Sequence, residues 1–486
     1  MSNVSEQVGT KIREVLPILE PLARQGVYRT PIYKYCLVVY PPRNSVETMQ
    51  ESGMAGIADK ISALPDGSPI DLYVHVPYCS RACTFCNFYF VPGLDEFSHR
   101  SELYTNCIQR ESEILGKLTS GRLTISSLYL GGGSPSLLRP EQINKILRSI
   151  EANVGSVSDI EVSLELHPEV VRLQNKDYLE RLREVGITRI SVGMQSSNPD
   201  ILKMTRRGHT AEEAYKLLES TRRLAFVRNV DLMWGFVNQR QEDHQRTLDS
   251  VIATQPDTVT TYFLEIRPKS PDFENYIKAT SDAEYQKRVI EMGILNRTVL
   301  ENSDFEERTF DYWFSGRDFE HRKRKWGGDD TVLLSLGPGT YNWIFHGEDK
   351  NIVFFKPYDT YRWAQDLWRG EYTADRSIVL GQEETKRRHA MFSLRQGKIS
   401  ERKVEDVQEL QQTAQALVDK GLATYSNGVF ELTLPGKLLN HEIATLFSSD
   451  RMLEASSSRL TPDELKYASF THPEILRRFK NVLREK

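Results

Sequence analysis

The chain has 486 residues, and its charges nearly cancel, with 63 Lys and Arg against 67 Asp and Glu. A net charge of −4 excludes the bulk basic field with which many proteins hold nucleic acid or an anionic membrane. No apolar run approaches the ~18–20 residues of a membrane span, and the polar N-terminus does not resemble a signal peptide. These features predict a cytoplasmic globular protein of roughly two or three domains that binds neither nucleic acid nor membrane.

The N-terminal extension is predicted to cover residues 1–69 and is a possible cap over a substrate. Its amphipathic pattern near 6–24 predicts a helix. An aromatic stretch comes next, and its tyrosines either close a pocket over a flat, conjugated substrate or pack as a surface strand. These tyrosines are Tyr28, Tyr33, Tyr35 and Tyr40.

Residues 70–270 alternate short β-branched runs with longer helical patterns. The predicted strands are 70–76, 125–130, 160–166, 187–193, 229–236 and 259–266. The predicted helices between them are 97–118, 139–153, 176–185, 210–225 and 243–254. Such alternation predicts an α/β fold with a parallel sheet, either open or curled into a barrel. In both forms the functional residues lie at the carboxyl ends of the strands.

The remaining sequence is predicted to contain a second, smaller domain. Residues 271–380 are less regular and are expected to complete the sheet and to link it to the C-terminal domain. Residues 381–446 combine two helices with a hairpin around Asn427-Gly428, which is typical of a winged helix. This hairpin contains no Lys or Arg, so a substrate lid or a packing role is expected rather than DNA binding. Residues 447–486 are predicted to be a helical tail.

Cysteine is scarce, but three of the five cysteines stand close together. So few cysteines, and an odd number, do not form a disulfide framework in a chain of this length. Cys107 falls in a predicted helix and Cys36 in the aromatic stretch, and packing is the expected role of both. Cys79, Cys83 and Cys86 remain as candidates for chemistry.

These three cysteines form a C-x3-C-x2-C motif directly after the first predicted strand. Three thiolates from one loop can bind three irons of a [4Fe–4S] cube and leave the fourth iron open to a small ligand. The alternatives are a redox dithiol or a zinc site, and zinc would need a fourth ligand, for which His75 is nearest in sequence.

The cysteine spacing, with Phe85 before the last cysteine, resembles the signature of radical S-adenosylmethionine (SAM) enzymes. The resemblance implies that the open iron chelates the methionine part of SAM. It also implies that reductive cleavage yields a 5′-deoxyadenosyl radical, with an electron from a flavodoxin or ferredoxin. Gly131-Gly132-Gly133-Ser134, at the end of the second strand, fits the same family's motif for the SAM amino group. Glycines allow a close approach, and their amides can bind an anionic or zwitterionic group.

Polar residues also stand at the ends of later strands. Each of them alone is typical of a helix cap or a surface residue, but together they would face one crevice of a parallel sheet. An arginine can pair with a carboxylate, and an aspartate with an ammonium group or ribose hydroxyls. The residues are Glu165, Gln195, Arg207 and Asp231.

The order of these motifs across about residues 70–446 resembles the oxygen-independent coproporphyrinogen III oxidase (HemN-like) family. The resemblance implies a partial (β/α)6 barrel with a helical, winged-helix-like C-terminal domain. It assigns two SAM molecules, with Gln195, Arg207 and Asp231 at the second, and it makes Tyr73, Glu165 and Gln195 the catalytic candidates. Glu265 and Tyr341 match the family in position but not in residue type. The implied SAM contacts are Tyr73, Phe85, Gly132, Gly133, Ser134, Glu165, Gln195, Arg207, Asp231, Glu265 and Tyr341.

One departure changes the expected reaction. Phe88 stands where the oxidase usually carries another cysteine, and an aromatic run after three cysteines occurs in the related class C radical SAM methyltransferases and cyclopropanases. No cysteines are left to carry a methyl group, and the leading residues are too few for a cobalamin domain. The first expectation is therefore methylation or cyclopropanation of an sp2 carbon in an aromatic, polyene or tetrapyrrole-like small molecule, with the second SAM as methylene donor. The alternatives are oxidative decarboxylation of coproporphyrinogen III and a haem-binding chaperone without turnover.

Overall fold

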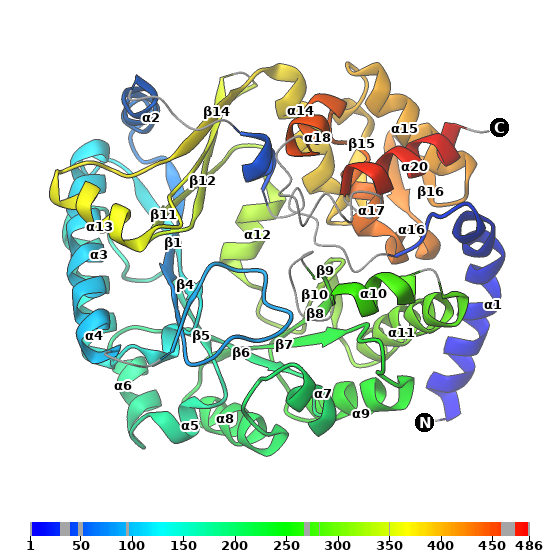
Figure 1. Cartoon of the computed structure of the whole chain (residues 1–486), viewed down its shortest axis with the longest axis horizontal. Coiled ribbons are helices and arrows are strands. Elements are labelled where there is room, and N and C mark those ends of the chain that lie inside the picture. Colours follow the sequence, from blue (N-terminus) through cyan, green and yellow to red (C-terminus); the bar gives the residue numbers. More distant parts are fainter. Residues whose placement is uncertain are drawn as a thin grey trace.

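A large mixed sheet forms the centre of the chain. The computed structural model describes residues 2–29, 39–46, 52–93, 97–266, 273–280, 282–348, 350–457 and 472–484. Within these residues the sheet has 12 strands, in the order β14-β13-β12-β11-β1-β4-β5-β6-β7-β8-β10-β9. Figure 1 shows the sheet curving through the molecule, with helices around its outside.

Six neighbouring strands of this sheet run parallel, as the sequence predicts. Most of their side chains are buried, because helices cover one face and the interior of the curved sheet lies on the other. The strands are β1 (Pro69–Val76), β4 (Thr124–Gly132), β5 (Glu161–Leu166), β6 (Arg189–Gln195), β7 (Val227–Trp234) and β8 (Thr258–Phe263).

The helices that link or cover these strands follow the predicted alternation. The connecting helices are α3 (Phe97–Thr119), α4 (Pro140–Asn153), α5 (Val170–Leu173), α6 (Tyr178–Glu184), α7 (Pro199–Met204), α8 (Ala211–Arg223) and α9 (Gln241–Ile252). Further helices are α1 (Ser2–Arg24), α2 (Ser52–Ser62), α10 (Phe273–Thr280), α11 (Ala283–Glu301), α12 (Glu320–Gly327) and α13 (Thr360–Trp368). No helix in the described part of the chain is long and apolar enough to span a membrane.

The region from 271 to 380 supplies the other half of the large sheet. On one side β10 (Tyr312–Phe314) and β9 (Glu306–Thr309) continue antiparallel from β8. On the other side β11 pairs in parallel with β1, and three antiparallel strands come after it. These are β11 (Thr331–Leu336), β12 (Tyr341–Phe345), β13 (Asn351–Phe355) and β14 (Arg376–Leu380). Helix α12 contacts β11, β1 and β4, which are neighbouring strands at one end of the parallel section.

The C-terminal region combines helices with a small antiparallel sheet, as predicted. Asn427 and Gly428 both have positive φ, 51° and 73°, which is the backbone that a two-residue hairpin turn requires. The sheet has the order β15-β17-β16, with β15 (Lys398–Ser400), β16 (Ala423–Ser426) and β17 (Val429–Leu432). The helices are α14 (Gln382–Leu394), α15 (Gln408–Asp419), α16 (Leu434–Leu438), α17 (Asn440–Thr445), α18 (Asp450–Ser457) and α20 (His472–Arg484).

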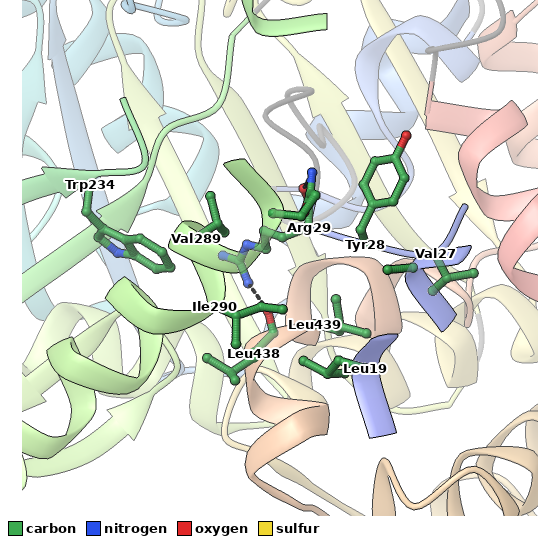
Figure 2. Close-up of a pocket in the computed structure, with 11 residues that line it drawn as sticks. Leu19, Val27, Tyr28, Arg29, Trp234, Val289, Ile290, Leu438 and Leu439 are labelled. Carbon is green, nitrogen blue, oxygen red and sulfur yellow. Dashed lines mark hydrogen bonds between the residues drawn. The ribbon is translucent and has the colours of Figure 1, made fainter. Parts of the chain in front are cut away.

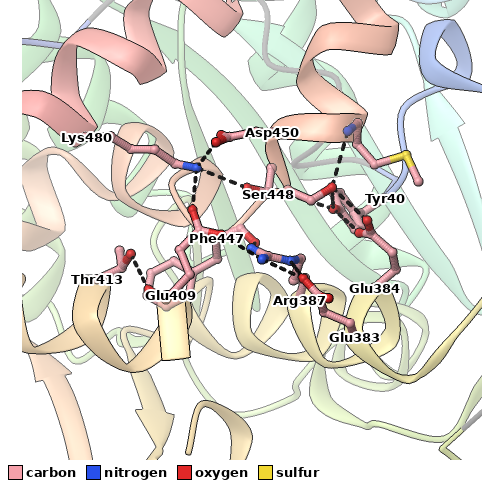
Figure 3. Close-up of polar contacts among 12 residues, drawn as sticks. Tyr40, Glu383, Glu384, Arg387, Glu409, Thr413, Phe447, Ser448, Asp450 and Lys480 are labelled. Atoms are coloured by element: carbon pink, nitrogen blue, oxygen red, sulfur yellow. Dashed lines mark hydrogen bonds and ion pairs between the residues drawn. The ribbon is translucent and has the colours of Figure 1, made fainter. Parts of the chain in front are cut away.

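Ion pairs of the buried Lys480 hold helix α20 of the tail on this region. Lys480 Nζ donates to Glu409 Oε1 and to Asp450 Oδ1, both at 2.8 Å, and to the carbonyl of Ser448 at 3.5 Å (Figure 3). Arg387 Nη2 donates to the other oxygen of Glu409 at 2.7 Å. The Lys480 side chain is 7% exposed. The tail helix is therefore part of the folded C-terminal region.

The N-terminal segment connects the barrel to the C-terminal region. Helix α1 packs on α11 and α16, and Arg29 follows it into an apolar pocket beside Trp234 (Figure 2). Arg29 Nη1 donates to the carbonyl of Leu438 at 3.0 Å and to Asn440 Oδ1 at 2.8 Å. Its guanidinium carbon lies 4.6 Å from the centre of the Phe263 ring. One arginine thus joins three distant parts of the sequence.

Two of the four N-terminal tyrosines have packing roles. Tyr28 lines the pocket of Figure 2, and Tyr40 is buried, with its hydroxyl donating to Glu384 Oε2 at 2.5 Å. A substrate-capping role for the extension stays a prediction. The other residues singled out in this stretch lie outside the described residues: Tyr33, Tyr35 and Cys36.

A fully buried ion pair fixes α3 to the sheet. Lys356 Nζ donates to Glu111 Oε1 and to the carbonyl of Ser335, both at 2.5 Å. The amide of Gly337 donates to Glu111 Oε2 at 2.6 Å, and Trp363 Nε1 donates to Oε1 at 3.1 Å. Both charged side chains have 0% exposure. The carboxylate depends on these donors because water does not reach it.

Replacing Lys356 with Met should destabilise the chain by about 3–5 kcal/mol, because it leaves the carboxylate of Glu111 buried without a counter-charge. Denaturant unfolding of the two proteins measures the difference. Lys117→Met is the control, because Lys117 is an exposed residue of α3, the helix that carries Glu111. It should change the stability by less than about 0.5 kcal/mol. Equal, small effects of both substitutions would show that the buried pair does not stabilise the fold.

Candidate active site

A cavity of about 310 Å³ opens at the carboxyl ends of the parallel strands. All but two of the predicted site residues line it, although they come from separate parts of the chain. Tyr73 and Tyr341 are not among the described residues that line this cavity. The predicted residues that do so are Cys79, Cys83, Phe85, Cys86, Gly132, Gly133, Ser134, Glu165, Gln195, Arg207, Asp231 and Glu265.

The three cysteines share one loop, which connects β1 to α3 along the chain and is the blue loop over the middle of the molecule in Figure 1. Two short strands, β2 (Tyr78–Cys79) and β3 (Val91–Pro92), pair and close this loop at its base. Ser134 Oγ lies 3.7 Å from Cys79 Sγ, and Arg207 Nη1 lies 3.5 Å from Cys83 Sγ. Both contacts place a hydrogen-bond donor on sulfur.

These thiols fit a cluster better than a single ion. Across the described residues, no three His, Cys, Asp or Glu side chains are arranged as for one metal ion. Cys79, Cys83 and Cys86 instead border a cavity wide enough for a larger group, and no fourth cysteine lines it among the described residues. Burial raises the pKa of the Cys79 thiol to about 12, so a bound metal must supply the energy that removes its proton. This donor set suits a [4Fe–4S] cluster with one open iron.

The glycine loop allows two segments to approach closely. A Cβ on Gly132, whose φ is +110°, would lie 2.4 Å from the ring of His75. A Cβ on Gly133 would lie 2.5 Å from the carbonyl oxygen of Tyr78. The amide of Gly133 donates to the carbonyl of Val76 at 2.8 Å, and that of Ser134 to the carbonyl of Tyr78 at 2.6 Å. These amides hold the cysteine loop in place, and the predicted contact of Gly132, Gly133 and Ser134 with SAM stays a prediction.

Glu165, at the end of β5, is a half-buried carboxylate that faces the cavity and has few protein partners. Tyr129 Oη donates to its Oε1 at 2.7 Å, and the amide of Gly132 donates to its Oε2 at 3.1 Å. Burial raises the pKa of Glu165 to about 7, and the nearby carboxylate of Asp231 also acts to raise it, against the two hydrogen bonds. An ammonium group of a ligand would offset the free-energy cost of keeping this carboxylate ionised.

Tyr73 lies behind the cavity wall. Its ring stacks on Tyr129 with a centroid distance of 6.0 Å, and its hydroxyl is 3.2 Å from His75 Nδ1. Tyr341, at the start of β12, accepts a hydrogen bond from Lys325 Nζ at 2.7 Å. Both tyrosines therefore support neighbouring elements, and their predicted contact with SAM stays a prediction.

The candidate second site is built at the ends of β6 and β7. A register shift between these strands precedes Gln195, and Gln195 has a positive φ of 68°. Irregularities of this kind turn a side chain away from its regular place in a strand. Asp231 accepts from Ser191 Oγ at 2.7 Å and from Asn229 Nδ2 at 2.9 Å, and burial raises its pKa. Arg207 is buried in the same wall.

The far end of the cavity is not predicted by the sequence. Arg395, just after α14, and His441, in α17, line it from the C-terminal region. His441 Nδ1 lies 2.7 Å from Glu265 Oε1, and Arg395 Nη2 lies 3.8 Å from Asp311 Oδ2. Although burial raises the pKa of Asp311, Arg322 and Arg395 hold it well below its usual range. The segment around His441 resembles the family's closing domain, but no local pattern in it indicates contact with the site.

The pKa of Glu165 predicts a pH-dependent stability. Because this pKa lies above the ordinary value near 4.5, the ionised carboxylate destabilises the fold above pH 7, and the penalty disappears as the pH falls towards 4.5. Glu165→Gln should therefore stabilise the ligand-free chain by about 2 kcal/mol at pH 8 and hardly at all at pH 5. Denaturant unfolding at both pH values measures this, with the exposed Glu405→Gln as control. The same gain at both pH values would contradict the assignment.

Comparison with known proteins agrees with this arrangement. Residues 73–251 match the model of the Radical SAM superfamily. The oxygen-independent coproporphyrinogen III oxidase of Escherichia coli (strain K12) is 28% identical over 261 residues. This alignment covers 54% of this chain and 54% of that protein. The enzyme of the same name from Salmonella typhimurium is 26% identical over 84% of this chain and 91% of its own length. The heme chaperone HemW of Buchnera aphidicola subsp. Schizaphis graminum is 27% identical over 46% of this chain and 58% of its own length.

A solved structure shares the fold over most of the chain. The coproporphyrinogen III oxidase from Escherichia coli superposes with a TM-score of 0.69 at 23% identity, over 87% of this chain and 99% of that one. The superfamily match spans β1 to α9, which carry the cysteine loop, the glycine loop and most of the polar strand ends. Residues 73–251 therefore form a radical SAM domain, in a chain whose homologues include oxygen-independent coproporphyrinogen III oxidases and haem chaperones.

Proposed function

We propose that this chain is a radical SAM enzyme that holds a [4Fe–4S] cluster on Cys79, Cys83 and Cys86. A cluster held by these residues would supply the one electron that cleaves SAM reductively, and the resulting radical would take a hydrogen atom from the substrate. The observation that carries the proposal is the shared cavity. It brings the three thiols together with the half-buried carboxylates of Glu165 and Asp231 at the strand ends.

The protein's own groups would bind and orient SAM. Glu165 and Asp231 are carboxylates in a wall of low dielectric, where an ammonium group or ribose hydroxyls are favoured partners. Arg207 offers a guanidinium to a carboxylate next to Cys83. Phe85 packs on an apolar cluster beside the cavity and would help to keep water from the reacting groups. The number of SAM molecules, expected to be two, is part of the proposal.

Oxidative decarboxylation is the reaction that the relatives favour. The alignment with the Salmonella enzyme extends over most of both chains, whereas the alignment with the haem chaperone covers little more than half of that protein. The far end of the cavity holds Arg395 and His441, which could bind a carboxylated side chain of a tetrapyrrole-like substrate. This reaction therefore replaces methylation or cyclopropanation as the first proposal.

Methylene transfer from a second SAM is kept as a second candidate because of Phe88. This side chain is 59% exposed and lines the cavity at the position where the oxidase family usually carries a cysteine. An aromatic ring there suits a flat, conjugated substrate. The single substitution does not outweigh an alignment over most of the chain.

Cys83→Ala should abolish both the cluster and turnover, because two thiols hold a cube poorly. After anaerobic reconstitution, the measurements are the absorbance near about 400 nm from iron–sulfur charge transfer and the 5′-deoxyadenosine formed with SAM and dithionite. Cys107→Ala is the matched control, since Cys107 is buried in α3 and does not line the cavity. The proposal fails if Cys83→Ala keeps the full cluster and full product yield.

The products should separate the two candidate reactions. With a porphyrinogen substrate and an added one-electron acceptor, decarboxylation should give 5′-deoxyadenosine, methionine and CO₂ without S-adenosylhomocysteine, because the substrate radical loses CO₂ and one electron to form the vinyl group. Methylene transfer would give S-adenosylhomocysteine as well, and its appearance in step with a methylated substrate would overturn the first proposal. Tight haem binding with neither SAM product would instead favour a chaperone.

A further inference from the structure

A basic patch covers the outer side of the cysteine loop. The patch surrounds a surface hollow of about 490 Å³ and does not belong to the cavity described above. Its members come from the cysteine loop and from the segment around α7, which Figure 1 places at the lower rim of the barrel. They are Arg81, Ala82, Leu202, Lys203, Arg206 and Gly208.

The patch lies very close to the thiols. Arg81 and Ala82 stand between Cys79 and Cys83 in the sequence and are exposed. Arg81 borders both the hollow and the cavity, so the same short loop separates them. On the α7 side, Arg206 precedes Arg207, whose Nη1 lies 3.5 Å from Cys83 Sγ. A protein seated on this patch would approach the thiols to within the thickness of one loop.

Two cations of the patch have no partner within the described chain. Lys203 and Arg206 are exposed, and no described side chain forms an ion pair or hydrogen bond with theirs. By contrast, Arg81 Nη2 pairs with Glu169 Oε1 at 2.5 Å. Asp200, one turn before Lys203, is exposed but does not pair with it.

The patch is locally positive in a chain of net charge −4. Arg172 adjoins it by donating to the carbonyl of Gly208 at 2.7 Å, and it pairs with Glu169 and Glu213. The patch and its neighbours thus carry one more positive than negative charge. The cations are Arg81, Arg172, Lys203 and Arg206, and the carboxylates are Glu169, Glu213 and Asp200. Surfaces of this sign steer acidic partners.

The patch also has an apolar part. Met204 is 37% exposed beside Lys203, and the side chains of Ala82 and Leu202 line the hollow. A small apolar area with a cationic rim suits brief contact with an acidic protein, as in weak redox complexes of less than about 1,200 Å². The cavity side of the loop is required for SAM and substrate, so an electron has to enter from another side.

We propose that this basic patch is the docking surface for an acidic one-electron carrier protein of the flavodoxin or ferredoxin kind. The inference rests on the proposed function and names the partner of the same site. The reduced carrier would give up one electron and so be oxidised. The same electron would reduce a bound cluster from [4Fe–4S]²⁺ to [4Fe–4S]⁺. The complementary charges bring the carrier's redox group to the loop between Cys79 and Cys83.

The test compares two reductants on the same protein. The double variant Lys203→Glu/Arg206→Glu should form 5′-deoxyadenosine at least tenfold more slowly with reduced flavodoxin at low salt. With dithionite, which needs no protein docking, its rate should equal that of the wild type. Added salt should slow the wild type with flavodoxin and change the variant little, because the charges that steer association are screened. Lys117→Glu on α3 is the control and should behave as the wild type.

The outcomes separate this inference from the proposed function. If the wild type makes no 5′-deoxyadenosine with either reductant, the proposed function itself is wrong. If the double variant keeps the wild-type rate with flavodoxin, the docking surface lies elsewhere. Should the double variant also lose activity with dithionite, Lys203→Gln/Arg206→Gln removes the charges without reversing them. The inference is also overturned if this second variant keeps its cluster absorbance and forms 5′-deoxyadenosine with reduced flavodoxin as fast as the wild type.

Discussion

Strands that run in the same direction must end at the same edge of their sheet, and the candidate site depends on this constraint. Glu165 lies opposite Ser191 in the pairing of β5 with β6, and Gln195 lies opposite Leu232 in the pairing of β6 with β7. Side chains far apart in the sequence therefore meet at one cavity. The crossover helices bury the outer face of the sheet, and only the loops at this edge are free to carry chemistry.

The site carries a cost in stability that the rest of the fold offsets. Glu165 and Asp231 are half-buried carboxylates whose pKa is raised by desolvation, and Gln195 has a backbone conformation that non-glycine residues seldom adopt. By contrast, the fully buried charges of Lys356 and Glu111 form an ion pair with each other. The carboxylates of raised pKa and the unusual backbone of Gln195 thus lie where a charged ligand is proposed to bind.

Much of the barrel could be predicted because buried parallel strands are continuous apolar runs. The run at 70–76 corresponds to β1 (Pro69–Val76), and the run at 160–166 corresponds to β5 (Glu161–Leu166). Long-range packing has no such signal. Neither the pairing of β11 with β1 nor the approach of Arg395 and His441 to the cavity leaves a periodic pattern in the sequence.

The glycine loop and Phe88 show two further limits of the sequence. The sequence correctly predicts the glycines at the end of a strand, but which partners their amides have depends on the cysteine loop packed against them. Phe88 favours methylene transfer, whereas similarity over most of the chain favours decarboxylation. A single side chain at a cavity gives less information about the reaction than the whole set of residues around it.

Cys79, Cys83 and Cys86 are proposed to hold a cluster whose fourth iron remains open to SAM. Electron paramagnetic resonance of the anaerobically reconstituted, dithionite-reduced chain tests this most directly, with spectra recorded before and after SAM is added. We expect the signal of a reduced [4Fe–4S]⁺ cluster whose g values shift when SAM binds. Identical spectra with and without saturating SAM would contradict it.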